Sequence, residues 1–151
     1  MTKRHTVCLC LRAFGLLALL SLSNFAISAD DQVAIIVNTS NSVGSLAPAD
    51  IHRIFLGDKS TWPNGKHIFL VMAPPGSSER AIVLKDIYKM SEAEYAKYFL
   101  QAAFTGAVSA PPKDAASAAE VKQLVAANPG AIGYVKAQDA DDSVKVLLKV
   151  P

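Results

Sequence analysis

The sequence is 151 residues long, carries a formal net charge of +2 at pH 7 and contains two cysteines. This length fits one domain of ordinary size with a sufficient core. The charge balance does not suggest the concentrated basic face of a nucleic-acid-binding protein. Both cysteines, Cys8 and Cys10, lie close to the first residue, which excludes a disulfide, a thiol nucleophile or a cysteine metal ligand for the rest of the chain.

The first 29 residues have the three-part pattern of a secretory signal peptide. Lys3 and Arg4 give a basic start, an apolar run covers residues 13–20, and small residues precede an expected cleavage after Ala29. The alternative is a membrane anchor, but polar residues interrupt the stretch before it reaches the ~20 apolar residues of a span. Cleavage removes three of the 15 Lys and Arg residues and none of the 13 acids, which leaves a net charge of −1. We therefore expect a soluble, periplasmic mature chain over residues 30–151, without a membrane anchor.

The first part of the mature chain predicts a strand, a short helix and a turn. Residues 33–37 are a continuous, largely β-branched run, typical of a strand covered on both faces in a mostly parallel sheet. Apolar residues at i, i+3 and i+4 then predict a helix that begins near Pro48 and ends before Gly57. Residues 62–65, Trp-Pro-Asn-Gly, predict a turn.

The middle of the chain predicts a strand and two helices. Residues 68–72 are a second continuous apolar run, which Pro74 and Pro75 end before a helix that begins near Ser78. A capping-box pair begins the next helix near Ser91, and an aromatic stripe along that helix is interpreted as core.

The last part of the chain predicts a connection, a helix and two strands. Residues 105–116 are rich in Ala, Gly, Ser and Pro and are interpreted as an exposed connection. A second capping box begins a helix near Ser117, and residues 132–135 and 144–150 are strand candidates. Alternating strands and helices predict a layered α/β domain in which the strands around Ile35, Val71 and Tyr134 share one sheet.

The loop between the second strand and its helix is the candidate ligand site. Gly76, Ser77 and Ser78 bring small residues and hydroxyls to a helix start, where backbone N–H groups and the helix dipole suit an anion. Arg80 in the first helical turn opposes the dipole, a conflict that a bound anion would resolve. The alternative is structural: a serine caps the helix, and Arg80 is a solvated charge that pairs loosely with Glu79.

Residues for catalysis or metal binding do not form a recognisable pattern. The sequence contains no Gly-x-Ser-x-Gly elbow, P-loop or dinucleotide fingerprint. His52 and His67 stand without the spaced partners that a metal site needs. We predict neither catalytic nor metal-binding residues and no cofactor, and an enzyme is the least supported class.

Four segments of the chain form a recognisable series: Ile54-Phe55-Leu56-Gly57, Trp62-Pro63-Asn64-Gly65, Gly76-Ser77-Ser78-Glu79-Arg80 and Pro129-Gly130-Ala131-Ile132-Gly133-Tyr134-Val135. Together they resemble the phosphate-binding proteins of ABC transporters, and more closely their short, single-lobe relatives. The resemblance covers nearly the whole mature chain. It implies one lobe of a type II periplasmic binding protein.

The resemblance also implies where phosphate would be held and how this chain departs from the family pattern. Family members offer a loop of the form Arg-x-x-x-Ser-Gly-Thr followed by Arg, in which Ser77 and Arg80 match. Ala73 replaces the leading arginine, Ser78 the glycine and Glu79 the threonine. Losing two or three hydrogen bonds to a charged ligand weakens binding by several decades, so we expect weak binding.

Two hypotheses from different classes follow. In the first, the chain is a solute-binding-type module that binds phosphate or a related small oxyanion weakly at Gly76, Ser77, Ser78 and Arg80. In the second, it is a ligand-free accessory or sensory subunit whose partner is an envelope or ABC-transporter membrane protein. The first predicts a gain in stability with ligand, and the second predicts a protein partner.

Overall fold

The computed structural model describes residues 32–108 and 110–151, so the predicted signal peptide lies outside the described residues. In chain order the elements are β1 (Val33–Asn38), α1 (Pro48–Leu56), β2 (Phe69–Met72), α2 (Ser78–Val83), the π-helical turn η2 (Leu84–Tyr88), α3 (Glu92–Thr105), β3 (Lys113–Asp114), α4 (Ala118–Ala127), β4 (Ala131–Lys136), the 3-10 turn η3 (Ala137–Asp139) and β5 (Val144–Val150). No helix in these two described ranges is long and apolar enough to cross a membrane.

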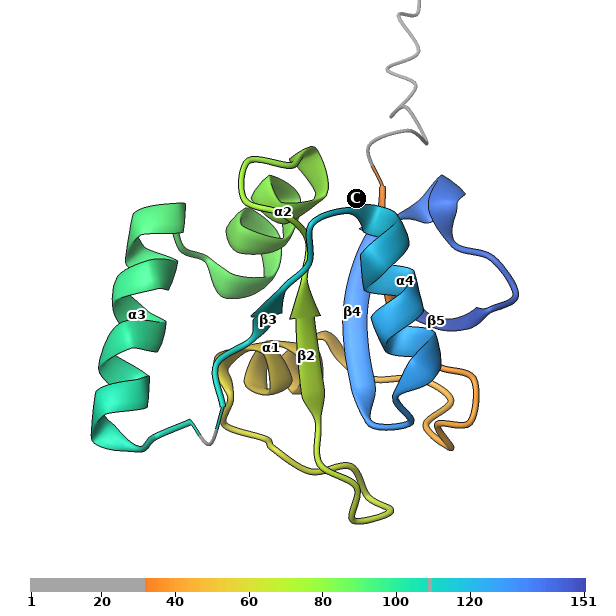
Figure 1. The fold of residues 1–151 in the computed structure, drawn as a ribbon, viewed down its shortest axis with the longest axis horizontal. Helices are drawn as coiled ribbons and strands as arrows, with labels where there is room; N and C mark the ends of the chain where they lie inside the picture. Colours follow the sequence, from red (N-terminus) through yellow and green to blue (C-terminus); the bar gives the residue numbers. More distant parts are fainter. Residues whose placement is uncertain (1–31, 109) are drawn as a thin grey trace, which may run out of the picture.

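The strands form one sheet in the order β3-β2-β4-β1-β5 (Figure 1). β2 pairs in parallel with both β3 and β4, whereas β1 pairs antiparallel with both β4 and β5. Every strand except β1 therefore runs in the same direction, which confirms the predicted α/β lobe with a mostly parallel sheet. The expected sharing of one sheet is also confirmed, because Ile35 lies opposite Tyr134 and Leu70 opposite Ile132.

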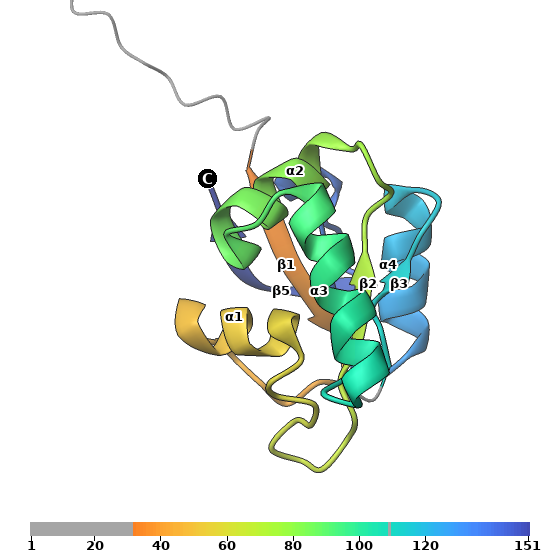
Figure 2. The same ribbon diagram turned by 90° about the vertical axis from the view of Figure 1, so that its left-hand side faces the viewer.

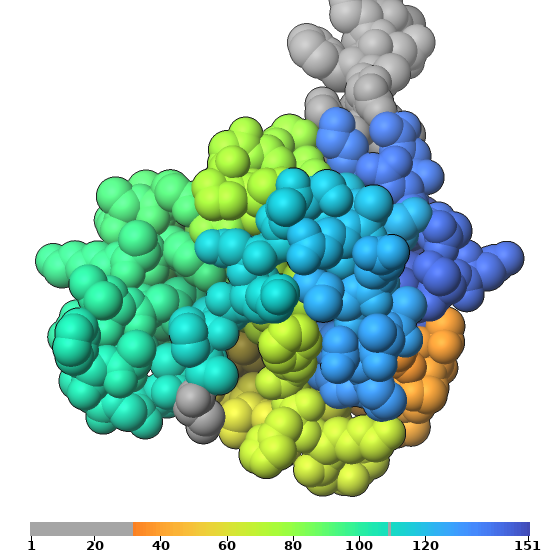
Figure 3. Space-filling model, in the orientation of Figure 1, coloured from red at the N-terminus to blue at the C-terminus, as the bar shows by residue number. Residues whose placement is uncertain are grey.

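Both faces of the sheet are covered, which explains why β1 is apolar at nearly every position. Side chains of Val33, Ile35 and Val37 join the larger core under α1, α2, η2 and α3. The alternate residues Ala34 and Ile36 join a smaller core under α4. The side view shows α4 on one side of the sheet and the other helices on the opposite side (Figure 2). On the face drawn in Figure 3, α4 lies beside the chain around β3, and α3 forms one flank of the molecule.

The four predicted helices begin within one residue of their expected positions. Ser77, Ser91 and Ser117 are the N-caps of α2, α3 and α4, and each side chain accepts a hydrogen bond from the backbone N–H three residues later. Both halves of the capping box are present in α3. The second predicted box is different, because the Glu120 carboxylate accepts from the N–H of Ala116 rather than from the N-cap residue.

The predicted connection over residues 105–116 contains a strand that sequence analysis missed. β3 pairs with the end of β2, where Val71 lies opposite Lys113 and Met72 opposite Asp114. Two exposed charged residues carry no alternation of apolar side chains, so only pairing with β2 makes this segment extended. The pairing places Asp114 beside the loop that follows β2.

Residues of the Ile-Phe-Leu-Gly, Trp-Pro-Asn-Gly and Pro-Gly-Ala segments meet near the first residue of β2, at the end opposite Met72. Gly57 ends α1 with a φ of 84°, in the left-handed region that favours glycine. The indole Nε1 of buried Trp62 donates to the carbonyl of Gly130 at 2.9 Å, and the Phe69 N–H donates to the same oxygen at 3.0 Å. A Cβ on Gly130 would collide with the carbonyl oxygen of His67. The two backbone segments therefore lie closer together than any residue other than glycine permits.

Candidate anion-binding site

The candidate site begins where β2 ends and the chain turns into α2. Gly76 has a φ of 82°, which suits a residue without a Cβ. The N–H of Ser77 donates to the carbonyl of Pro74 at 3.1 Å, and the Ser77 hydroxyl accepts from the N–H of Arg80 at 3.3 Å. Ser78 and Glu79 occupy the first helical turn, where backbone N–H groups have no intrahelical acceptor. The loop is thus held by its own hydrogen bonds and presents N–H groups at the helix start.

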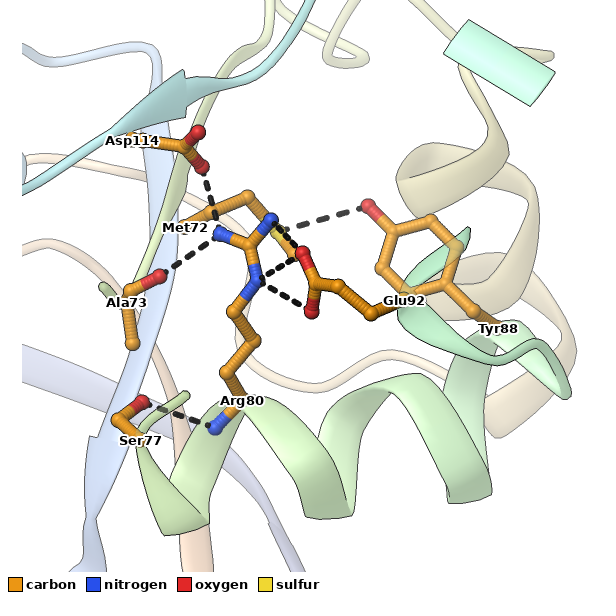
Figure 4. A network of polar contacts seen from close by, with 7 residues as sticks. All are labelled: Met72, Ala73, Ser77, Arg80, Tyr88, Glu92 and Asp114. Atoms are coloured by element: carbon orange, nitrogen blue, oxygen red, sulfur yellow. Dashed lines mark hydrogen bonds and ion pairs between the residues drawn. The ribbon is translucent and has the colours of Figure 1, made fainter. Parts of the chain in front are cut away.

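The Arg80 side chain lies at the centre of a polar network (Figure 4). Its Nε lies 3.1 and 3.0 Å from the two carboxylate oxygens of Glu92, and its Nη2 lies 2.7 Å from Glu92 Oε1. Its Nη1 donates to the carbonyl of Ala73 at 2.9 Å and to Oδ1 of Asp114 at 2.6 Å. The network therefore joins α2, the start of α3, the edge strand β3 and the end of β2.

Exposure differs sharply between the partners in this network. The Arg80 side chain is 2% exposed, whereas those of Glu92 and Asp114 are 49% and 52% exposed. The guanidinium also lies over the ring of Tyr95, 5.1 Å from its centroid. Burial raises the pKa of the Tyr95 hydroxyl, so this ring stays neutral beside the cation. A buried cation is thus neutralised by two carboxylates that remain in contact with water.

The same contacts keep the Arg80 guanidinium protonated. Burial by itself would lower the pKa of the guanidinium, but the hydrogen bonds that it donates to Glu92 and Asp114, together with the negative charges of these carboxylates, outweigh burial, so the pKa lies above its ordinary value. The structure corrects the alternative interpretation of Arg80 as a solvated charge that pairs with Glu79. That interpretation is wrong because the side chain turns inward to carboxylates 12 and 34 residues further along the chain.

The structure brings three of the four predicted ligand residues to one hollow. Gly76, Ser77 and Arg80 line a cavity of about 410 Å³, together with Lys85 and Ser91 among others. Ser78 is not among the lining residues. Its hydroxyl instead donates to the carboxylate of Glu79 at 3.1 Å, and Glu79 is itself buried.

Sequence reasoning missed Glu92 and Asp114 as parts of this site. An acidic residue in the first turn of a helix is usual because it suits the helix dipole, so Glu92 carries no special signal. Asp114 follows a Pro-rich connection and becomes a neighbour of Arg80 through the pairing of β3 with β2. Only the tertiary arrangement reveals that both acids face one guanidinium. Among residues 32–108 and 110–151, no group of three or more His, Cys, Asp or Glu side chains is arranged to hold a metal ion.

Comparison with solved structures gives the fold: a single α/β lobe like that of substrate-binding proteins. The lobe is similar to a putative phosphate ABC transporter substrate-binding protein with bound phosphate from Clostridium perfringens, with a TM-score of 0.61 and 24% identity over 76% of this chain and 43% of that chain. It is also similar to an ABC-type phosphate transport receptor from Vibrio cholerae, with a TM-score of 0.59 and 20% identity over 76% of this chain and 44% of that one.

A third similar structure is PstS from Borrelia burgdorferi, with a TM-score of 0.60 and 15% identity over 76% of this chain and 46% of that chain. The chain spans less than half of the length of each of these three proteins. No protein-family model and no curated protein sequence matches it. At this level of identity the likeness shows the fold, which is that of one lobe of a phosphate ABC transporter substrate-binding protein.

Proposed function

We propose that this chain is an exported, periplasmic, non-enzymatic solute-binding-type module that binds phosphate or a related small oxyanion weakly. Gly76, Ser77, Ser78 and Arg80 are the proposed ligand-binding residues. The supporting observation is the strand–loop–helix segment beside a buried guanidinium, in a fold whose Clostridium perfringens neighbour is described with bound phosphate.

Weak binding follows from the charges around the loop. Glu79 stands in the first turn of α2, and Glu92 and Asp114 already contact the guanidinium of Arg80. A multiply charged anion at this position is opposed by these three negative charges, and Glu92 lines the hollow itself. We expect a dissociation constant on the order of 0.1–1 mM that rises with ionic strength. Tighter capture requires a facing wall, which a second chain such as an envelope or ABC-transporter membrane protein would supply.

Isothermal titration calorimetry of residues 30–151 with phosphate and with sulfate tests this function. Ser77→Ala and Arg80→Lys should weaken binding, because the first removes a hydroxyl and the second removes the planar donor set of the guanidinium. Glu79→Thr combined with Ala73→Arg should strengthen binding. Circular dichroism checks that each variant folds. Unchanged affinity in both weakening variants contradicts the proposed residues.

A second function, a ligand-free accessory or sensory subunit, is favoured by one different observation. Leu100 and Phe104 on α3 are 62% and 85% exposed, which is unusual for large apolar side chains. They lie one helical turn apart and so share a face of α3. This function predicts no heat of binding with either anion, and it assigns the α3 face to a protein partner in the envelope.

A further inference from the structure

The donors of Arg80 are almost fully used within the protein itself. A guanidinium has five N–H donors in a planar fork. Nε–H, both N–H groups of Nη1 and one of Nη2 point at oxygens of Glu92, Asp114 and Ala73. Two-point contact of a carboxylate with the Nε and Nη2 edge is also the arrangement by which guanidinium groups bind carboxylate or phosphate ligands. Glu92 therefore takes the place on Arg80 that an external oxyanion would need.

The two carboxylates can leave this place more easily than the guanidinium can. Their side chains are about half exposed, so water replaces their hydrogen bonds when they turn outward. Arg80 is buried to 2% exposure and cannot follow them. Glu92 and Asp114 also belong to separate elements, the start of α3 and the edge strand β3, so that each can be displaced alone.

We propose that Glu92 and Asp114 are tethered competitors for the oxyanion site. This role rests on the proposed function, and it gives the physical cause of the low affinity expected there. Without ligand, the two carboxylates neutralise the buried cation; with ligand, the oxyanion takes over the Arg80 donors and displaces at least Glu92. Removing both negative charges should leave the buried cation without counter-charge, so that a bound oxyanion stabilises it more. Lys85, which lines the same hollow, adds positive charge near the vacated position.

Phosphate titrations of four proteins at one pH and ionic strength test the inference. They are the wild-type mature chain, Glu92→Gln, Asp114→Asn and the double variant, with affinity measured by calorimetry. Each single substitution should lower the dissociation constant about tenfold, because a neutral amide holds the guanidinium more weakly than a carboxylate does and no longer repels the anion, and the double variant should lower it more. Asp141→Asn is the matched control, since Asp141 forms an exposed ion pair with Lys122 away from Arg80. Its affinity should equal that of the wild type.

Thermal unfolding with and without phosphate gives a second readout. In phosphate-free buffer the Glu92→Gln and Asp114→Asn proteins should melt below the wild type, and saturating phosphate should raise their Tm by more than it raises that of the wild type. Each single variant keeps one carboxylate on the guanidinium, so the test still holds if the double variant fails to fold.

The outcomes separate this inference from the proposed function. Tighter phosphate binding by the variants supports the competitor role, even when wild-type binding is too weak to detect. Measurable wild-type binding with unchanged or weaker affinity in both single variants overturns the competitor role and leaves the proposed function standing. Absence of phosphate binding and of Tm rescue in every protein overturns the proposed function, and the competitor role with it.

Discussion

The two ends of β2 are built in different ways. At the end that begins with Phe69, the contacts are an indole hydrogen bond and a close backbone approach at Gly130. At the end that finishes with Met72, the contacts are ionic and centre on Arg80. The motifs Ile-Phe-Leu-Gly and Pro-Gly-Ala-Ile-Gly-Tyr-Val supply residues to the first end. The loop that departs from the family pattern forms the second.

This difference indicates which end of β2 can change its residues without loss of the fold. A backbone contact that only glycine permits, or a buried indole donor, tolerates few replacements without loss of stability. At the other end the two carboxylates are half exposed, so water can replace their contacts, while the buried guanidinium accepts any partner that supplies a negative charge. The fold can therefore persist while the ligand chemistry at the other end changes.

The largest expected effect is at the glycine end, the end of β2 that begins with Phe69 and contacts Gly130. Gly130→Ala places a Cβ against the carbonyl oxygen of His67, which must move together with its backbone. We expect the free energy of unfolding to fall by about 3 kcal/mol or more, measured by urea denaturation. Gly44→Ala is the control, because a Cβ there meets no atom within 4 Å. An equal loss in both variants would contradict the steric explanation.

At the ionic end, where β2 finishes with Met72, the loss of stability should depend on which member of the Arg80 network is replaced. Replacing Glu92 and Asp114 by Gln and Asn leaves a buried cation without counter-charge, and we expect a loss of about 2 kcal/mol in the free energy of unfolding. Arg80→Met should cost less, because the two carboxylates that remain are already half exposed. Urea denaturation in anion-free buffer measures both. A larger loss from Arg80→Met would show that the guanidinium stabilises the fold mainly through its other contacts, with the Ala73 carbonyl and the Tyr95 ring.

Trp62→Phe isolates the hydrogen bond at the glycine end. The substitution removes the Nε1 donor and some buried volume, while the Phe69 N–H still donates to the Gly130 carbonyl. The free energy of unfolding should fall by about 1–2 kcal/mol. Phosphate affinity should not change, because this contact lies at the end of β2 opposite the candidate site. A change in phosphate affinity would mean that the two ends are coupled.

The smallest effect on stability is expected at the exposed pair of Lys122 and Asp141. This pair serves as the exposed comparison for the buried network around Arg80. The hydrogen bond from Lys122, followed by that from Ser143, holds the pKa of Asp141 well below its ordinary value of about 3.9. Stability from a depressed carboxyl pKa is present above that value and is lost as pH falls through the folded pKa. Asp141→Asn should therefore slightly destabilise the protein at pH 6, and the difference should shrink below about pH 4. Thermal melts across this range measure it, with Asp142→Asn as the control.

The sequence by itself determined four of the five described strands, the helix starts and the two-sided burial of the sheet. Continuous runs such as residues 33–37 and the capping serines Ser77, Ser91 and Ser117 are local signals, and local hydrogen bonds or apolar periodicity enforce them wherever they occur. The loop at Gly76 was found for the same reason, since a strand, a glycine and a capping serine follow one another directly.

Only the tertiary structure decided what surrounds Arg80. Glu92 and Asp114 lie 12 and 34 residues away, and β3 is extended because β2 pairs with it rather than because of its own residues. The antiparallel direction of β1 is likewise set by its neighbours, since a strand buried on both faces has the same composition in either direction. Long-range pairing and the choice of ionic partners depend on which segments the fold brings together, and no local pattern encodes that choice.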